Sequence, residues 1–333
     1  MRTIKIGPND AGQRLDKFIG KALPSIPQSL MYKFIRTKKI KVNRKRAEPQ
    51  TLLNEGDELS LFIGEDLFPP QDGKHDVSGF IENIVPKLEV LYEDGNILLL
   101  NKRPGILVHE DKEGNTNTLS SHLKAYLYRK GEYDPASENS FAPALCNRID
   151  RNTGGIVVAA KNAAALREMN RLIKEGRLSK YYICAVHGIP RPEEGLLRSY
   201  LRKDSDRNTV DISDRPRDGY LEIRTGYRTL AKRDGNSLLE IRLYTGRTHQ
   251  IRAQMAHIGH PLLGDGKYGV INCDKKKGYR YQALWSYRVV FDFGSDGGVL
   301  RYLSGREYSV DPAGIWFCAD FGYPGGGDDR HER

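Results

Sequence analysis

Near the N-terminus, apolar side chains repeat first with the spacing of a helix and then with that of a strand. This spacing predicts one helix over residues 15–23, which Pro24 ends because proline cannot continue a helix. A second helix is expected after Pro27, with Ser29 as its N-cap. Two short strands are predicted further on, at 40–43 and 58–62. We therefore expect residues 1–64 to form a small α+β domain.

Beyond residue 86 the pattern is mainly that of strands. Residues 88–92 and 97–101 are rich in apolar side chains and flank an Asp-Gly hairpin turn. A few helices are expected in this part, among them one over 163–174 with apolar residues on one face and one over 249–258 that Thr248 is expected to cap. Two further strands are predicted, a buried one at 156–160 and a half-buried one at 239–244. The second part is thus expected to be a mixed, mainly antiparallel sheet with flanking helices.

Turn-forming residues separate these two parts and also end the chain. Pro69, Pro70 and Gly73 mark residues 65–86 as a linker, although its later apolar residues are expected to dock on a folded surface. Glycine and charged residues dominate the C-terminus, so 321–333 is expected to be a flexible tail. The predicted organisation is a domain at 1–64, a linker at 65–86, a larger domain at 87–320 and the tail. The fold class is α+β.

Charge is distributed unevenly over these parts. The chain of 333 residues carries a formal net charge of +10. Residues 12–63 alone hold eleven Lys and Arg against five Asp and Glu. A basic concentration in one small domain favours a polyanionic partner.

The remaining composition argues against several other classes of protein. The four cysteines are scattered without a CxxC pair, so neither a disulfide framework nor a zinc site is expected. Three histidines lie close together in the sequence at 249, 257 and 260, but no acidic or Cys residue stands near them at the spacing of metal ligands. No apolar run is long enough to span a bilayer. We expect a cytoplasmic protein that binds no metal and no membrane.

A turn around Asp150 is the first candidate for chemistry. The segment Asn147-Arg148-Ile149-Asp150-Arg151-Asn152-Thr153-Gly154-Gly155 leads into the predicted buried strand at 156–160. Two flanking arginines favour an ionised carboxylate, and the two glycines permit a tight turn. From the residues alone, a structural turn with solvated charges explains the segment as well as a catalytic carboxylate does.

Two later segments hold further polar and aromatic residues in ordered positions. One is the predicted strand Lys180-Tyr181-Tyr182-Ile183-Cys184-Ala185-Val186-His187-Gly188. The other is Thr245-Gly246-Arg247-Thr248-His249-Gln250-Ile251-Arg252, which continues to Gly259-His260-Pro261-Leu262-Leu263-Gly264-Asp265 and to Tyr268-Gly269. An aromatic residue in a strand is usually part of a core, so this pattern by itself leaves the role of Tyr182 open.

Together these segments resemble, in order, the motifs of the RluA family of RNA pseudouridine synthases. The resemblance implies that Asp150 is the catalytic carboxylate, that Tyr182 contacts the flipped base, and that Arg252 pairs with Asp150. It places Arg148 and Arg247 beside the RNA. Two positions depart from the family pattern, since Asn147 stands where His is common and Gly154 where Ser is common. A preceding segment, 91–109, resembles the family's leading strand pair and is interpreted as scaffold and RNA-facing surface.

The N-terminal part resembles an S4 domain. The matching landmarks are Arg14-Leu15-Asp16-Lys17-Phe18-Ile19, Lys39-Ile40-Lys41-Val42-Asn43 and Glu55-Gly56-Asp57-Glu58. Clustered cations of this kind contact phosphates with little sequence selectivity. The residues expected to bind RNA here are Lys33, Arg36, Lys38, Lys39, Lys41 and Arg44.

The resemblance implies an enzyme that converts uridine to pseudouridine within an RNA and needs no cofactor. An S4 domain ahead of such a domain favours ribosomal RNA of the large subunit, with transfer RNA as the alternative substrate. A different class of function is a non-catalytic RNA-binding factor in ribosome assembly. A glycoside hydrolase would need a second carboxylate, and none stands out beside Asp150. We expect a monomer with no obligatory protein partner.

Overall fold

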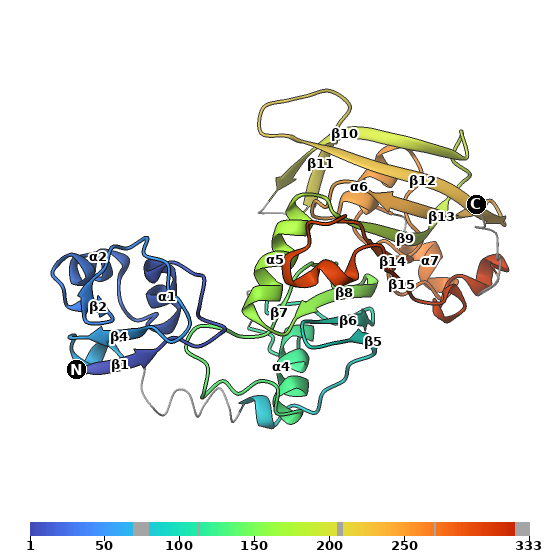
Figure 1. The fold of residues 1–333 in the computed structure, drawn as a ribbon. Helices are drawn as coiled ribbons and strands as arrows, with labels where there is room; N and C mark the ends of the chain where they lie inside the picture. Colours follow the sequence, from blue (N-terminus) through green and yellow to red (C-terminus); the bar gives the residue numbers. More distant parts are fainter. Residues whose placement is uncertain (69–79, 112–113, 205–208, 270, 324–333) are drawn as a thin grey trace.

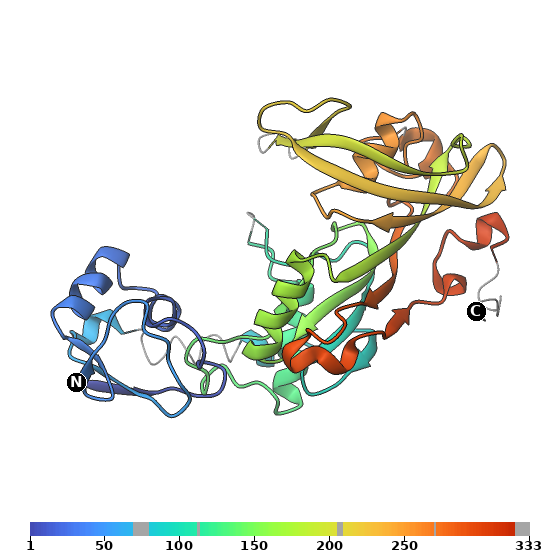
Figure 2. The same cartoon turned by 45° about the horizontal axis from the view of Figure 1, so that its top comes forward.

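Two β-sheets organise the computed structural model, which describes residues 1–68, 80–111, 114–204, 209–269 and 271–323. Figures 1 and 2 both show the smaller sheet and its helices to one side of the larger sheet. The smaller sheet has the strand order β1-β4-β2-β3, and all its pairings are antiparallel. Its elements are β1 (Arg2–Lys5), α1 (Leu15–Ala22), α2 (Gln28–Arg36), β2 (Ile40–Val42), β3 (Lys45–Arg46), β4 (Glu58–Leu61) and the 3-10 turn η1 (Glu65–Leu67).

The small domain has an apolar core of its own. Leu15, Phe18 and Ile19 of α1 pack with Ile35 of α2 and with the buried face of the sheet. The helices follow the predicted positions, but Ser29 does not cap α2: Pro27 occupies the N-cap position, and no side chain makes a capping bond. A proline at this place already holds the backbone in an extended conformation, so the helix begins without a capping hydroxyl.

The larger sheet has eleven strands. Nine follow the order β11-β10-β12-β13-β9-β14-β8-β6-β5, while β15 pairs with β14 and β7 with β8. The pairing of β14 with β8 is parallel, and the other strand pairings are antiparallel. The strands are β5 (Val90–Glu93), β6 (Ile97–Lys102), β7 (Ala144–Leu145), β8 (Gly154–Ala160), β9 (Leu178–His187), β10 (Glu194–Asp204), β11 (Thr209–Ser213), β12 (Leu221–Arg233), β13 (Asn236–Leu243), β14 (Leu284–Phe291) and β15 (Glu307–Ser309).

Helices cover both faces of this sheet. Leu98 of β6 and Val157 of β8 face α4, whereas Leu99 and Val158 face α5, so both strands are buried on two sides. On the other half of the sheet, α6 packs over the face of β9 that carries Tyr182. The helices are α4 (Leu119–Arg129), α5 (Ala163–Lys174), α6 (Gln250–His257) and α7 (Ile271–Lys276), with the 3-10 turns η2 (Gly298–Leu303), η3 (Pro312–Gly314) and η4 (Ala319–Phe321).

Two of these helices show how local sequence sets their start. The helix α5 has the predicted bounds, because the Asn162 side chain accepts a hydrogen bond from the Ala165 N–H at 2.8 Å. The predicted cap of α6 is wrong: His249, not Thr248, precedes the first helical residue, and its φ is 54°. The Gln250 side chain instead accepts the Arg247 N–H at 3.1 Å, which leaves Thr248 exposed in the loop.

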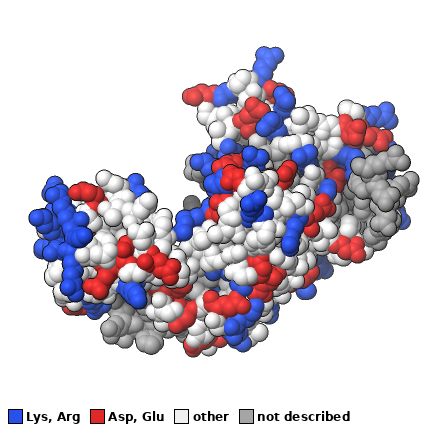
Figure 3. Space-filling model, viewed as in Figure 1, with Lys and Arg blue, Asp and Glu red and all other residues white. Residues whose placement is uncertain are grey.

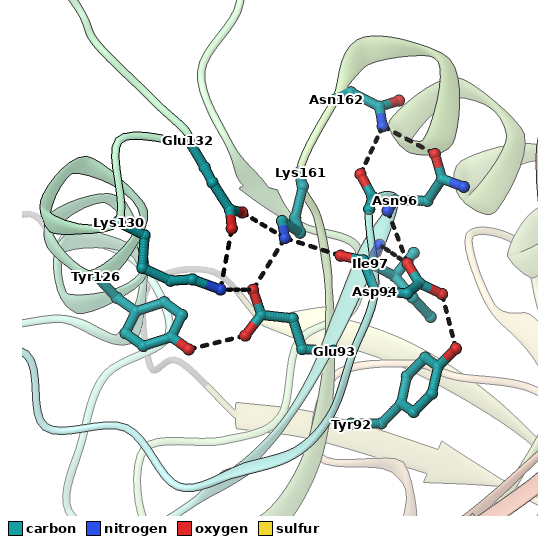
Figure 4. Close-up of polar contacts among 11 residues, drawn as sticks. Tyr92, Glu93, Asp94, Asn96, Ile97, Tyr126, Lys130, Glu132, Lys161 and Asn162 are labelled. Atoms are coloured by element: carbon teal, nitrogen blue, oxygen red, sulfur yellow. Dashed lines mark hydrogen bonds and ion pairs between the residues drawn. The ribbon is translucent and has the colours of Figure 1, made fainter.

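A network of charged side chains joins β5, β8 and α4 (Figure 4). Lys161, which follows β8, pairs with Glu93 at 2.9 Å and also with Glu132. Lys130 lies between the same two carboxylates, at 2.5 and 3.0 Å. Burial would raise the pKa of Glu93, but hydrogen bonds from Lys130, Lys161 and Tyr126 outweigh it and lower that pKa to about 2. Lys161, the residue after β8, therefore stabilises the fold away from Asp150.

The predicted linker and tail are partly folded. Phe68 lies in the small core and Ile81 in the core under α4, whereas 69–79 lie outside the described residues. At the other end, Phe321 packs against the main core. The folded chain thus extends beyond residue 320, because the Phe321 ring belongs to the core that α5 covers. The rest of the predicted tail, 324–333, lies outside the described residues.

A row of polar contacts, here called the polar seam, joins the two domains. Asp10 accepts hydrogen bonds from Ser140 at 2.6 Å and from Asn139 at 2.8 Å. Asn9 binds Glu138 at 2.6 Å, and Gln13 donates to Ser140 at 2.9 Å. The small core contains no residue of the larger domain. The domains therefore dock through polar groups and do not share an apolar core.

Candidate active site

Asp150 lies in the loop between β7 and β8, and its side chain meets Arg252 of α6. The turn is closed by the Thr153 N–H, which donates to the Asp150 carbonyl at 3.1 Å. The Asn147 side chain accepts the Val158 N–H at 2.8 Å and so fixes the start of the loop to β8. The side chain of Asp150 remains 25% exposed, which leaves the carboxylate accessible to a substrate.

Arg252 on α6 holds the Asp150 carboxylate. Its Nη1 lies 2.6 Å from Asp150 Oδ2. On its other edge, Nε and Nη2 make a two-pronged contact with Asp265, at 2.7 and 2.9 Å. Burial works against the charged guanidinium, but the hydrogen bonds and charges of Asp265 and Asp150 outweigh it and raise the pKa of Arg252. A bidentate pair fixes the plane of the guanidinium, so Asp265 determines where Arg252 can hold Asp150.

Asp265 is a site residue for which no role was predicted from the sequence. It is fully buried, and backbone N–H groups of Lys267 and Tyr268 donate to it beside Arg252. Burial would raise the pKa of Asp265, but these contacts lower it, led by that of Arg252. Its signal in the sequence was its place in the block that resembles the RluA family, since nothing local shows that Asp265 would meet Arg252.

Tyr182 on β9 lies on the face of the sheet that α6 covers. It is 5% exposed and packs in the core that contains Ile251 and Ile149. Burial raises the pKa of Tyr182 to about 12, and the negative charge of Asp150 acts in the same direction. The phenol is therefore neutral at physiological pH and carries a proton next to the carboxylate.

His249 and Tyr268 complete the wall beside the carboxylate. His249 Nε2 lies 3.9 Å from Asp150 Oδ2, and its Nδ1 lies 2.9 Å from the Tyr268 hydroxyl. The same hydroxyl accepts the Val210 N–H at 3.0 Å. Burial lowers the pKa of His249, which favours the neutral ring. From the sequence this histidine was considered only as a metal ligand, and the structure places it next to Asp150.

Lys102 supports the loop from behind. It is 1% exposed, and its ammonium donates to the carbonyl groups of Arg103, Ile106 and Arg151 at 3.1, 2.9 and 2.8 Å. Burial lowers the pKa of Lys102 to about 7, while the charge of Asp150 acts in the opposite direction. Lys102 thus ties the end of β6 to the residue after Asp150, in the segment interpreted from sequence as scaffold.

Packing against β14 accounts for both glycines that follow the loop. A Cβ on Gly154 would lie 2.7 Å from Cδ2 of Trp285 and would overlap its six-membered ring. A Cβ on Gly155, whose φ is 109°, would lie 2.6 Å from the carbonyl carbon of Ser286. The large ring of Trp285 therefore explains why this chain has glycine where the family commonly has serine.

The residues expected to bind RNA lie on the surface. Arg148 and Arg247 are exposed, and neither makes a hydrogen bond or ion pair with Asp150 among the described residues. Arg151 also turns away, since its Nε donates to the Gly105 carbonyl at 3.2 Å. Arg252, and not a flanking arginine, forms the ion pair with Asp150.

The cationic residues of the small domain gather on its outer edge. Figure 3 shows Lys and Arg side chains concentrated there, over α2 and β2. All six predicted residues are at least partly exposed, and within the described parts of the chain none forms an ion pair: Lys33, Arg36, Lys38, Lys39, Lys41 and Arg44. Unpaired surface cations are free to contact phosphates.

The histidines do not form a metal site in the described part of the chain. His257 Nε2 contacts Asp214 at 2.8 Å, and His260 Nδ1 contacts the His187 carbonyl at 2.9 Å, each away from His249. No cluster of three His, Cys, Asp or Glu suited to a metal occurs among the residues described. No helix within them has the length and apolar character needed to cross a membrane.

Known proteins resemble both domains. Residues 96–257 match the RNA pseudouridylate synthase family, and residues 13–59 match the S4 domain. The chain is 34% identical to an uncharacterised RNA pseudouridine synthase of Mycoplasma genitalium over 84% of this chain and 85% of that protein. It is 30% identical to ribosomal large subunit pseudouridine synthase C of Buchnera aphidicola over 87% of this chain and 88% of that protein. The fold resembles that of human RNA pseudouridylate synthase domain containing 1, with a TM-score of 0.53 and 21% identity. The match covers 72% of this chain and 88% of the human protein.

Proposed function

Since the chain belongs to the RNA pseudouridylate synthase family, we propose that Asp150 is its catalytic carboxylate and that its substrate is ribosomal RNA of the large subunit. One observation carries the catalytic part of the proposal. The Asp150 side chain is 25% exposed, while the arginine that holds it is itself fixed by the buried Asp265.

The reaction requires a carboxylate that is oriented before the substrate arrives. Pseudouridine forms when the bond from C1′ to N1 of uracil breaks and a bond from C1′ to C5 forms; C5 loses a proton and N1 gains one. Asp150 acts on the ribose of the target uridine. Because the Arg252–Asp265 pair fixes its direction, little reorganisation is needed on binding.

Tyr182 is proposed to contact the detached uracil. Its ring lies on the sheet face that α6 covers, near enough for the charge of Asp150 to act on its pKa, and its hydroxyl is neutral because burial raises that pKa to about 12. A neutral phenol can pass a proton while the base rotates. The uridine must leave its helical stack to reach Asp150, so Arg148 and Arg247 are proposed to hold the flanking phosphates.

Two observations support ribosomal RNA as the substrate. The chain carries an S4 domain with an unpaired cationic edge, and a relative that matches over most of its length is named a ribosomal large subunit synthase. The small domain is proposed to bind RNA through Lys33, Arg36, Lys38, Lys39, Lys41 and Arg44.

The test is a pseudouridine map of ribosomal and transfer RNA from cells that lack this protein. The cells are complemented with the wild-type chain, with Asp150→Asn, or with the exposed control Asp218→Asn. We expect large-subunit signals to disappear in the deletion and to return with wild type and the control but not with Asp150→Asn. Loss from transfer RNA alone refutes the proposed substrate, and restoration by Asp150→Asn refutes the catalytic role.

If no position changes and the purified protein still binds RNA, the alternative of a non-catalytic assembly factor replaces the proposal. Asp150→Asn keeps the size of the side chain and removes its charge, so binding measured with this variant separates recognition from chemistry.

A further inference from the structure

Arginine and tyrosine side chains alternate in a row across the larger sheet, on the face opposite Tyr182. Arg288 of β14 lies over the Tyr181 ring at 3.8 Å, and Arg242 of β13 lies 5.7 Å from the same ring. Arg242 also lies 4.8 Å from the ring of Tyr244. The strand register aligns them, because Tyr181 pairs with both Arg242 and Arg288. Four side chains are thus stacked in succession.

This row lies outside the part of the face that the fold covers. Successive residues of a strand point to opposite faces, so Tyr182 faces α6 while Tyr181 lies on the other face of the sheet. Next to the row, Ile183 and Leu238 are covered by α5 and the C-terminal segment. Tyr244, by contrast, is 46% exposed. The aromatic faces and guanidinium edges of the row are therefore partly open to a ligand.

Two more arginines extend the cationic character toward the edge of the sheet. Arg198 of β10 pairs directly with Arg224 of β12, whose side chain is 47% exposed. Like charges placed opposite each other on two strands are destabilising, so this arrangement suits an anionic partner. Figures 1 and 2 show β10 and β12 as long strands at one end of the sheet.

Acidic residues neutralise only part of this charge. Glu240 and Glu307 pair with Arg288 at 3.0 and 3.4 Å, and the contact of Arg224 with Glu222 is 3.8 Å long. Among the described residues, Arg198 and Arg242 form no ion pair. The guanidinium groups of Arg198 and Arg242 therefore keep hydrogen-bond donors available. That of Arg242 is already stacked on the rings of Tyr181 and Tyr244.

We propose that this surface, the Arg–Tyr face, binds a single-stranded segment of the substrate RNA on the side of the sheet opposite the catalytic residues. It is formed by Tyr181, Arg198, Arg224, Arg242, Tyr244 and Arg288. The arginines contact phosphates, and unpaired bases stack on the tyrosines and on the planar guanidinium groups, which tolerates many sequences. This second contact rests on the protein's action on RNA and is distinct from the small domain.

The test compares two RNAs that contain the same target uridine. One is a minimal stem-loop, and the other carries single-stranded extensions on both sides. The variant combines Arg198→Ala, Arg224→Ala and Arg242→Ala. We expect it to bind the extended RNA about tenfold more weakly, with the slope of log affinity against log salt smaller by about 2, because each lost contact to single-stranded phosphate contributes about 0.7. Binding and turnover of the stem-loop are expected to stay unchanged.

The matched control combines Lys174→Ala, Arg177→Ala and Arg301→Ala, which remove three exposed cations near α5 and η2. A second variant, Tyr244→Ala, removes a stacking surface and keeps the charge; its affinity for the extended RNA is expected to fall about fivefold or more. Unchanged affinity in both variants overturns the proposal, and so does an equal loss for the two RNAs or for the control. Because the readout is binding, it stands even if wild-type turnover of the chosen uridine is absent, which would count only against the proposed function.

Discussion

Gly154 gives a sharp test of how the catalytic loop is packed. Replacing it by serine, which is common there in the family, places a Cβ against the six-membered ring of Trp285. Overpacking of this kind costs about 1–3 kcal/mol. For a domain of this size that corresponds to a fall in Tm of about 2–12 °C. We expect Gly154→Ser to be folded but less stable, with turnover preserved because the contacts of Asp150 are unchanged.

The reasoning also predicts a rescue. Trp285→Leu alone leaves a cavity and costs about 2–5 kcal/mol. In that background Gly154→Ser is expected to cost at least about 1 kcal/mol less than in the wild type, because the ring that it meets is gone. The matched comparison is Gly155→Ala: its Cβ meets the backbone of Ser286, at a positive φ, so loss of the Trp285 ring brings no relief.

The assay is equilibrium unfolding in denaturant for wild type, both single variants and the double variant, with the slopes checked for two-state behaviour. If Gly154→Ser lies within about 0.5 kcal/mol of wild type, the ring is not what excludes a side chain there. If its cost is the same with and without Trp285, the explanation for the glycine also fails.

Three further changes test the site and the fold. Tyr182→Phe keeps the ring but removes the hydroxyl, so turnover is expected to fall about a hundredfold with RNA affinity unchanged, while Tyr181→Phe on the opposite face leaves turnover intact; equal turnover in the two variants argues against a proton-carrying hydroxyl. A lysine at position 252 cannot bridge Asp150 and Asp265, so Arg252→Lys is expected to lose at least about a hundredfold in turnover and about 3–5 kcal/mol in stability. Adding Asp265→Asn should recover the stability but not the turnover, and recovery of both would contradict the proposed positioning. Burial would raise the pKa of Glu93, but its lysine partners lower it to about 2 from the ordinary 4.5. The contribution of Glu93 to stability is therefore present above pH 4.5 and is lost as the pH falls toward 2. Glu93→Gln should make the free energy of unfolding depend less on pH in that range, and an unchanged dependence would show that the network does not contribute.

Local patterns predicted the elements better than they predicted what lies between them. The bounds of α5 follow from Asn162 and the apolar spacing after it. The caps expected at Ser29 and Thr248 were wrong, because Pro27 and the Gln250 side chain meet those backbone requirements in ways that composition does not reveal.

The site itself depends on contacts that no local pattern encodes. Asp150 meets Arg252 across 102 positions of sequence, and Arg252 in turn meets Asp265 through the turn after α6. Resemblance to a family indicated the first pair, while the roles of Asp265 and of His249 beside Asp150 needed the folded sheet. The tight approach of Trp285 to Gly154 likewise required the parallel pairing of β14 with β8.

The polar seam between the domains determines how easily they can separate. Its contacts are hydrogen bonds among Asn9, Asp10, Gln13, Glu138, Asn139 and Ser140, and water can replace each of them when the domains part. Because the small core is complete without the larger domain, separation uncovers little apolar surface. The two domains can therefore part and dock again at little cost in apolar burial.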